Sequence, residues 1–176
     1  LAQTIKGFEY FVTGTGDDTL IADTLAGTDN QFYLGSGNDL VSYASVTTTA
    51  LTVTLDTSTI GNATVRGVGT DSITGAESLT GGSGNDTFVG FIASGLTIDG
   101  GAGVDWVSYS GTATGVTVDL SAGGKTIRGS ETQVLTNFEA AIGSTANDSF
   151  VGDAAVANGF TGDNGNDTYD LSNSGA

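Results

Sequence analysis

The sequence contains no cysteine, histidine, proline or methionine, and these absences exclude several kinds of chemistry. Without cysteine the chain forms no disulfide. Without histidine and cysteine it has no Ser-His-Asp triad, no H-E-x-x-H zinc motif and no cysteine nucleophile. Paired carboxylates of the kind that hydrolyse glycosides are not excluded. The acidic residues follow a repeat, however, and repeat ladders are seldom active sites, so we expect no enzymatic activity.

Basic residues are also scarce. Four of them (Lys6, Arg66, Lys125 and Arg128) stand against 20 acidic residues, which gives a formal net charge of −16. This charge argues against nucleic acid and anionic membrane surfaces as partners. No run of eighteen apolar residues predicts a membrane span, and the first residues, LAQTIKGFEYF, lack the regions of a signal peptide. Because the chain starts without Met and in mid-pattern, we interpret it as a processed product or a fragment of a longer repeat protein.

Glycine is abundant, with 29 residues, and much of it falls into one pattern. The stretch Gly81–Ser108 begins with GGSGNDTFV and ends with GGAGVDWVS. Each unit reads Gly-Gly-x-Gly-x-Asp followed by a short x-apolar-x run. The glycines permit a sharp turn that points several carbonyl oxygens at one place. Calcium takes six to eight oxygen ligands, so such a turn with one Asp supplies half of a calcium site.

The spacing of the units supplies the other half of the site. If one unit forms half a coil, Asp86 and Asp105, which are 19 residues apart, lie one full coil apart on the same edge. Neighbouring coils are about 4.8 Å apart, close enough for two turns to share an ion. The same pairing recurs at Asp18/Asp39 and at Asp148/Asp167. We therefore expect at least three calcium ions.

The expected ligands are turn residues of these three blocks. Ala146 replaces the fourth glycine of its unit, which puts the turn at Asp148 in question, and Asp163 replaces a second glycine and could add a carboxylate. The aspartates could instead be simple turn formers, but six at paired spacing before an apolar residue favour calcium. The candidate ligands are Gly14, Gly16, Asp18, Gly35, Gly37, Asp39, Gly82, Gly84, Asp86, Gly101, Gly103, Asp105, Ser144, Asp148, Asp163, Gly165 and Asp167.

Glutamate recurs at one place in each block, eight or nine residues before the first turn aspartate. These residues, Glu9, Glu77 and Glu139, are either further ligands or partners of a backbone group. Because carboxylates are rarely buried without a partner, we favour a solvated or hydrogen-bonded structural role.

The blocks divide the chain into three imperfect repeats, residues 4–72, 73–134 and 135–176, of one β-solenoid domain. The second and third align without a gap at an offset of 62. Two linking segments, Ala44–Ser72 and Ser110–Val134, carry alternating runs that predict half-buried strands at Leu51–Leu55 and Val116–Leu120. No helix is expected. The aligned apolar positions predict a narrow ladder-like core. These positions are Leu20, Phe32, Val41, Phe88, Ile98, Val107, Phe150, Phe160 and Tyr169.

The units GTGDDTLI, GSGNDLVSY, GGSGNDTFVG, GGAGVDWVSY and GDNGNDTYD resemble the haemolysin-type calcium-binding repeats of the repeats-in-toxin family. The linking pattern WVSYSGTATGVTVDLSAG resembles segments that alternate with such repeats in large bacterial secreted and surface proteins. The resemblance covers nearly the whole chain. It implies an all-β, right-handed parallel β-roll with calcium at its turns, and export by a type I secretion system to the extracellular space or the bacterial cell surface. It does not fix one activity.

Three functions remain open from the sequence. The first is a calcium-stabilised structural segment of a secreted or cell-surface protein, such as an S-layer, adhesin or filament component. The second is a calcium-binding accessory module of a secreted enzyme or toxin. The third is a sugar- or ice-binding module, suggested by runs such as Thr52/Thr54, although the β-propensity of Thr explains these runs. Because solenoid ends need capping, we expect self-association or continuation of the solenoid at both ends.

Overall fold

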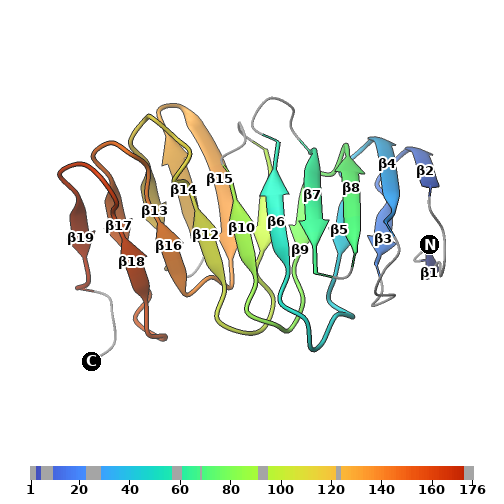
Figure 1. The fold of residues 1–176 in the computed structure, drawn as a ribbon. Helices are drawn as coiled ribbons and strands as arrows, with labels where there is room; N and C mark the ends of the chain where they lie inside the picture. Colours follow the sequence, from blue (N-terminus) through green and yellow to red (C-terminus); the bar gives the residue numbers. More distant parts are fainter. Residues whose placement is uncertain are drawn as a thin grey trace.

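The computed structural model describes residues 3–4, 10–22, 29–56, 61–67, 69–90, 95–121 and 124–172. In this part of the chain, short strands form two mostly parallel β-sheets that face each other along an elongated body (Figure 1). The described residues contain no helix, and hence no helix that could cross a membrane. The expected all-β fold with parallel strands is therefore confirmed.

The first sheet, sheet A, has the strand order β1-β3-β5-β9-β11-β15-β14-β13-β17-β19. In that order the strands are β1 (Gln3–Thr4), β3 (Thr19–Ile21), β5 (Leu40–Ser42), β9 (Ser78–Thr80), β11 (Thr97–Asp99), β15 (Glu131–Thr136), β14 (Lys125–Arg128), β13 (Thr117–Asp119), β17 (Ser149–Val151) and β19 (Thr168–Asp170).

The second sheet, sheet B, has the order β18-β16-β12-β10-β6-β7-β8-β4-β2. Its strands are β18 (Gly159–Thr161), β16 (Ala140–Ile142), β12 (Trp106–Ser108), β10 (Thr87–Val89), β6 (Thr52–Leu55), β7 (Ala63–Arg66), β8 (Thr70–Thr74), β4 (Gln31–Ser36) and β2 (Tyr10–Thr15).

Within the blocks the chain alternates between the two sheets, so each turn lies at one of two long edges. The turns that lead from sheet B to sheet A form edge I, and the turns that lead from sheet A to sheet B form edge II. Strands one coil apart pair in register. Phe88 of β10, for example, pairs with Val107 of β12 and with Val53 of β6. One unit therefore makes half a coil, as the spacing predicted.

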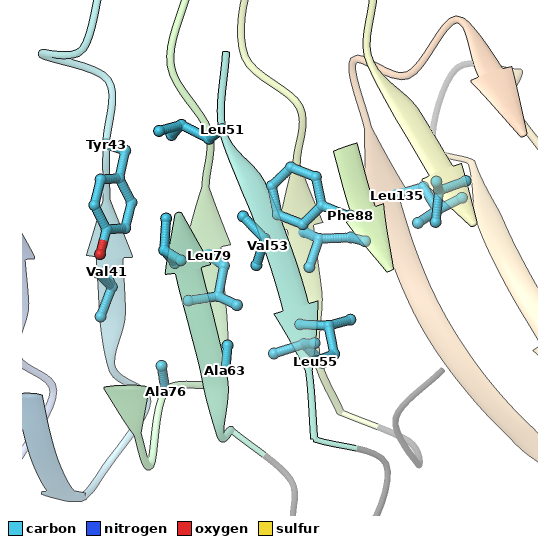
Figure 2. Close-up of a cluster of buried hydrophobic side chains, with 14 of the residues drawn as sticks. Val41, Tyr43, Leu51, Val53, Leu55, Ala63, Ala76, Leu79, Phe88 and Leu135 are labelled. Atoms are coloured by element: carbon cyan, nitrogen blue, oxygen red, sulfur yellow. The ribbon is translucent and has the colours of Figure 1, made fainter. Parts of the chain in front are cut away.

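The space between the sheets is filled by single apolar side chains, one or two from most of the strands. Figure 2 shows Val53 and Phe88 of sheet B beside Leu79 of sheet A. The alternation in β6, where Val53 and Leu55 are buried and Thr52 and Thr54 exposed, confirms the half-buried strand predicted there. The ladder arises because aligned positions in successive parallel strands carry apolar residues.

Most of the predicted inward positions are confirmed as buried. Phe160 is only partly buried, and Tyr169 keeps 46% of its surface exposed. Tyr169 still faces the core, because its ring stacks on Phe150 with centroids 5.2 Å apart. It belongs to β19, the outer strand of sheet A among the described residues, so no further strand there covers its other side. The buried positions are Leu20, Phe32, Val41, Phe88, Ile98, Val107 and Phe150.

The linking segments correct the expectation of a wholly parallel roll. In the first segment, β7 runs antiparallel to both β6 and β8, so three consecutive strands lie side by side in sheet B. In the second segment, β14 runs antiparallel to β13 and β15 in sheet A. Each segment thus inserts a short meander into one sheet. Alternating apolar residues specify a strand but not the direction of its neighbour, so the sequence pattern did not reveal this.

Buried tyrosines fix these meanders to the blocks. The hydroxyl of Tyr43, which directly follows β5, donates a 2.8 Å hydrogen bond to Oδ2 of Asp71 in β8. At the corresponding place after β12, the hydroxyl of Tyr109 lies 2.7 Å from Oγ1 of Thr126 and 2.9 Å from Oε1 of Gln133. Burial raises the pKa of both tyrosines, and at Tyr43 the nearby Asp71 carboxylate raises it further, so both hydroxyls stay protonated donors.

Candidate functional site

Each predicted pair of turn aspartates is joined by a direct hydrogen bond across one coil. The backbone N–H of Asp18 donates to Oδ1 of Asp39 at 2.8 Å. The N–H of Asp86 donates to Oδ1 of Asp105 at 2.7 Å, and the N–H of Asp148 donates to Oδ1 of Asp167 at 2.9 Å. The structure therefore brings together all three pairs that the sequence predicted. We call these stacks the aspartate ladders.

The three ladders do not lie on one edge of the molecule. The turns of Asp18 and Asp39 follow strands of sheet B and lie at edge I, as do those of Asp148 and Asp167. The turns of Asp86 and Asp105 follow β9 and β11 of sheet A, which places them at edge II. The middle block is thus on the opposite edge from the other two.

The recurring glutamates form the last rung of two ladders. The N–H of Asp39 donates to Oε2 of Glu77 at 2.9 Å, and the N–H of Asp105 donates to Oε2 of Glu139 at 2.8 Å. This confirms the role of a partner for a backbone group. Each glutamate serves the ladder of the preceding block, across the stack, rather than the block in which it stands. Glu9 lies outside the described residues.

The start of two ladders is formed by the linking segments. The N–H of Leu51 donates to Oδ1 of Asp86 at 2.7 Å, and the N–H of Val116 donates to Oδ1 of Asp148 at 2.8 Å. The ladder at edge II therefore runs from Leu51 through Asp86 and Asp105 to Glu139. These contacts satisfy N–H groups in the turns that make no hydrogen bond within either sheet.

A second, exposed ladder runs through the residue before each aspartate. Oδ1 of Asp17 accepts the N–H of Asn38 at 2.9 Å. Oδ1 of Asn85 accepts the N–H of Val104 at 3.0 Å, and Oδ1 of Asn147 accepts the N–H of Asn166 at 2.8 Å. A short side chain with an acceptor oxygen is needed at the first turn of each pair, which explains why Asn and Asp stand there.

The glycines of the second turn in each pair adopt conformations that other residues avoid. Gly35, Gly101, Gly103 and Gly165 have φ of +88°, +99°, +139° and +122°. A Cβ added to Gly101 would collide with the carbonyl oxygen of Gly82 in the neighbouring coil. The coils can approach to strand-pairing distance only because this side chain is absent.

The first turns of the second and third blocks differ, and this explains the departures from the motif. Gly82, Gly84, Ser144 and Ala146 are not among the residues with positive φ. Ala146 is therefore tolerated without backbone strain, and the expected disturbance of the Asp148 turn does not occur. Ser144 even holds that aspartate, with its N–H 2.7 Å from Oδ2 and its Oγ 2.7 Å from Oδ1.

Asp163, in contrast, stands at a position with positive φ, +68°. Its side chain is exposed, and its backbone takes the conformation that Gly101 has in the second block. Asp is one of the few residues other than glycine that visit this region, so it fills the position at a modest cost. The remaining predicted glycines, Gly14, Gly16 and Gly37, also have positive φ, of +138°, +115° and +153°.

Several carboxylates of the ladders are fully buried, and two of their oxygens have no partner. Asp39, Asp86, Asp105 and Asp148 are 4% exposed or less. Both oxygens of Asp86 are bonded, Oδ1 to Leu51 N–H and Oδ2 to Gly82 N–H at 2.6 Å. Oδ2 of Asp39 and Oδ2 of Asp105 are buried without any hydrogen bond. A buried carboxylate oxygen without a donor is costly, and a cation would remove that cost.

The environment of these carboxylates disfavours their charge. Burial raises the pKa of Asp86, although the N–H groups of Leu51 and Gly82 oppose the shift. Burial also raises the pKa of Asp105 to about 6, opposed by the Asp86 N–H and increased by the carboxylates of Asp86, Glu139 and Asp99. A calcium ion close to these groups would favour the ionised form and reverse the direction of the shift.

Backbone carbonyls point to the same places as the carboxylates. A Cβ on Gly81 would meet both Oδ2 of Asp86 and the carbonyl oxygen of Gly100 in the next coil. A Cβ on Gly143 would meet Oδ2 of Asp148 and the carbonyl oxygen of Gly162. Each of these small spaces, kept open by the lack of a side chain, thus holds one carboxylate and one carbonyl oxygen from successive turns.

Side chains alone do not complete a metal site in the described part of the chain. No group of three or more His, Cys, Asp or Glu side chains converges there. Any cation in these turns needs backbone carbonyls and water besides one or two carboxylates, which is a ligand set that calcium accepts. The residues present fit an oxygen-ligated cation and offer no nitrogen or sulfur ligand.

Sequence reasoning missed Asp71, which is 1% exposed and is held by the Tyr43 hydroxyl and by the side-chain amide of Asn30 at 2.7 Å. The signal was available, because Asp71 occupies an inward position of an otherwise alternating strand. Only the meander shows that a tyrosine lies opposite.

The comparisons with known proteins do not place the chain in a family. No protein-family model matches the chain, and no curated protein matches its sequence.

Proposed function

We propose that this chain is a calcium-stabilised structural segment of a secreted or cell-surface bacterial protein, such as an S-layer, adhesin or filament component, with the repeats-in-toxin type of calcium turn. The observation that carries the proposal is the stacking of the three aspartate pairs, each joined across one coil by a hydrogen bond and each with at least one buried carboxylate. At Asp86, Asp105 and Asp148, a carbonyl oxygen of the next coil faces the same gap as the carboxylate. A cation bound between these turns would remove the cost of burying their carboxylates.

In this proposal calcium has a structural role. The ladders join one coil to the next, and the ions would hold together turns that carry like charges. The core contributes only one or two apolar side chains per strand, against an ordering cost of about 1–2 kcal/mol per residue. Calcium bound only to the folded chain adds about 2.7 kcal/mol per site at a hundredfold excess over the dissociation constant. Three sites then contribute roughly 8 kcal/mol, comparable to the stability of a typical domain.

The proposal predicts that calcium controls folding. We expect the chain to be largely unfolded in excess chelator. It should gain its β-sheet circular dichroism at calcium concentrations of about 10⁻⁴–10⁻³ M, the range in which extracellular modules bind calcium. The double variant Asp86→Ala, Asp105→Ala should need more calcium and fold less cooperatively. The exposed Asp170, which is outside the ladders, provides a control as Asp170→Ala. An unchanged β-sheet spectrum in chelator would contradict the proposal.

The accessory module of a secreted enzyme or toxin is the alternative, with the same calcium turns and the chemistry elsewhere. The two differ in assembly, because self-association in calcium is expected of the structural segment and a monomer of the accessory module.

A further inference from the structure

The turn that carries Glu139 stacks on the turn of Asp105, although its sequence, TNFE, has none of the turn glycines. The N–H of Asp105 donates to Oε2 of Glu139 at 2.8 Å. In the other direction, the N–H groups of Glu139 and Ala140 lie 3.2 and 3.1 Å from the carbonyl oxygen of Asp105. These contacts fix the glutamate carboxylate against the aspartate turn.

The gap between these two turns has the same oxygen lining as the gaps between paired aspartates. A Cβ on Gly100 would meet Oδ2 of Asp105 and the carbonyl oxygen of Asn137. Gly81 faces Oδ2 of Asp86 and the Gly100 carbonyl in the same way. Asn137 has a φ of +55°, the left-handed conformation that the turn glycines also use, so its carbonyl can take this direction without a glycine.

The oxygen that faces this gap is the one without a partner. Oδ2 of Asp86 accepts the N–H of Gly82, but Oδ2 of Asp105 is buried and accepts nothing. Asp39 at edge I shares two of these features. Its Oδ2 is unpartnered, and its N–H donates to Oε2 of Glu77 at 2.9 Å. The two unpartnered aspartate oxygens therefore both occur in the turn that precedes a glutamate rung.

We propose that each glutamate rung closes a further calcium site, one between Asp105 and Glu139, with the Asn137 carbonyl as third ligand, and one between Asp39 and Glu77. The inference rests on the proposed calcium-binding function and extends it beyond the nonapeptide motif. Oxygen ligands from carboxylate, carbonyl and water suit calcium.

Equilibrium dialysis of calcium against the folded chain tests the inference. The wild-type chain should bind two ions more than its paired aspartate turns provide. The variant Glu77→Gln, Glu139→Gln should lose those two ions and keep the others, because the glutamine amide oxygen still accepts the Asp39 and Asp105 N–H groups. Glu131→Gln is the matched control. It makes the same kind of substitution once, in β15, where Glu131 pairs with Arg128 at 2.7 Å, and should leave the number of ions unchanged.

Each outcome separates the inference from the function on which it rests. Wild-type binding of three ions, or a glutamine variant that keeps the wild-type number, overturns the additional sites and leaves the proposed function intact. A wild-type chain that binds no calcium overturns the proposed function itself. If the glutamine variant does not fold at saturating calcium, as judged by circular dichroism, the wild-type number alone decides.

Discussion

At the level of single residues, the two carboxylate oxygens of each buried turn aspartate have different roles. One oxygen accepts the N–H of the preceding coil, which aligns the stack, and the other is either bonded within its own turn or left unpaired. Asp86 and Asp148 are of the first kind, whereas Asp39 and Asp105 are of the second. All four residues are aspartates, and the surrounding turn decides whether the second oxygen is hydrogen-bonded.

A second residue-scale feature, the buried pair of Tyr43 and Asp71, yields a prediction on stability. In Tyr43→Phe the Oδ2 of Asp71 loses its donor while staying buried, and we expect the free energy of unfolding to fall by about 1–3 kcal/mol. Tyr109→Phe removes a hydroxyl that lies against the uncharged side chains of Thr126 and Gln133. We expect a smaller loss of the free energy of unfolding in this variant.

Urea unfolding of both variants in saturating calcium measures the difference. If both variants lost the same free energy of unfolding, the buried carboxylate of Asp71 would not make the Tyr43 hydrogen bond the stronger one.

At the scale of the element, the turns decide how closely the coils approach. Gly101 combines a φ of +99° with direct contact to the Gly82 backbone, so both conformation and space exclude a side chain. The first turns of the second and third blocks do not need positive φ, and there Ser144 and Ala146 are found. At these two positions the absence of positive φ is what permits a residue with a side chain.

We expect Gly101→Ala to destabilise the protein by about 1–3 kcal/mol from the strained backbone, and further from the collision with the Gly82 carbonyl. Gly111→Ala is the control, because Gly111 has no atom within 4 Å of an added Cβ and no positive φ. Thermal unfolding in saturating calcium compares the two, and a Gly101 variant as stable as the Gly111 variant would show that the coils can separate without cost.

At the scale of the whole molecule, the parallel strands leave an open side at each end of the described stack (Figure 1). At one end, Tyr169 and Leu171 are 46% and 50% exposed, and at the other Tyr10 is 59% exposed. Strand edges with apolar neighbours can pair with another chain. Electrostatic repulsion opposes this contact as long as the charge of −16 is not neutralised.

We therefore expect the chain to associate with itself in millimolar calcium and to remain dispersed in chelator. Sedimentation velocity at several protein concentrations measures the association. A strict monomer at high protein concentration in calcium would contradict the structural-segment proposal and favour the accessory module.

The coil can be predicted from the order of the residues. The nonapeptide spacing set half a coil per unit, paired Asp18 with Asp39, Asp86 with Asp105 and Asp148 with Asp167, and placed the buried apolar ladder. These features depend on local turn geometry and on a period of two along each strand, which a sequence records directly.

The other features depend on which strands become neighbours, and the folded structure was needed to see them. It showed that β7 and β14 are antiparallel, that the middle ladder lies at edge II, and that Glu77 and Glu139 complete the ladders of the preceding blocks. The partners in these contacts are separated by 34 or more residues at the glutamate rungs. Neither the spacing nor the composition of one block specifies where the next block returns to the stack.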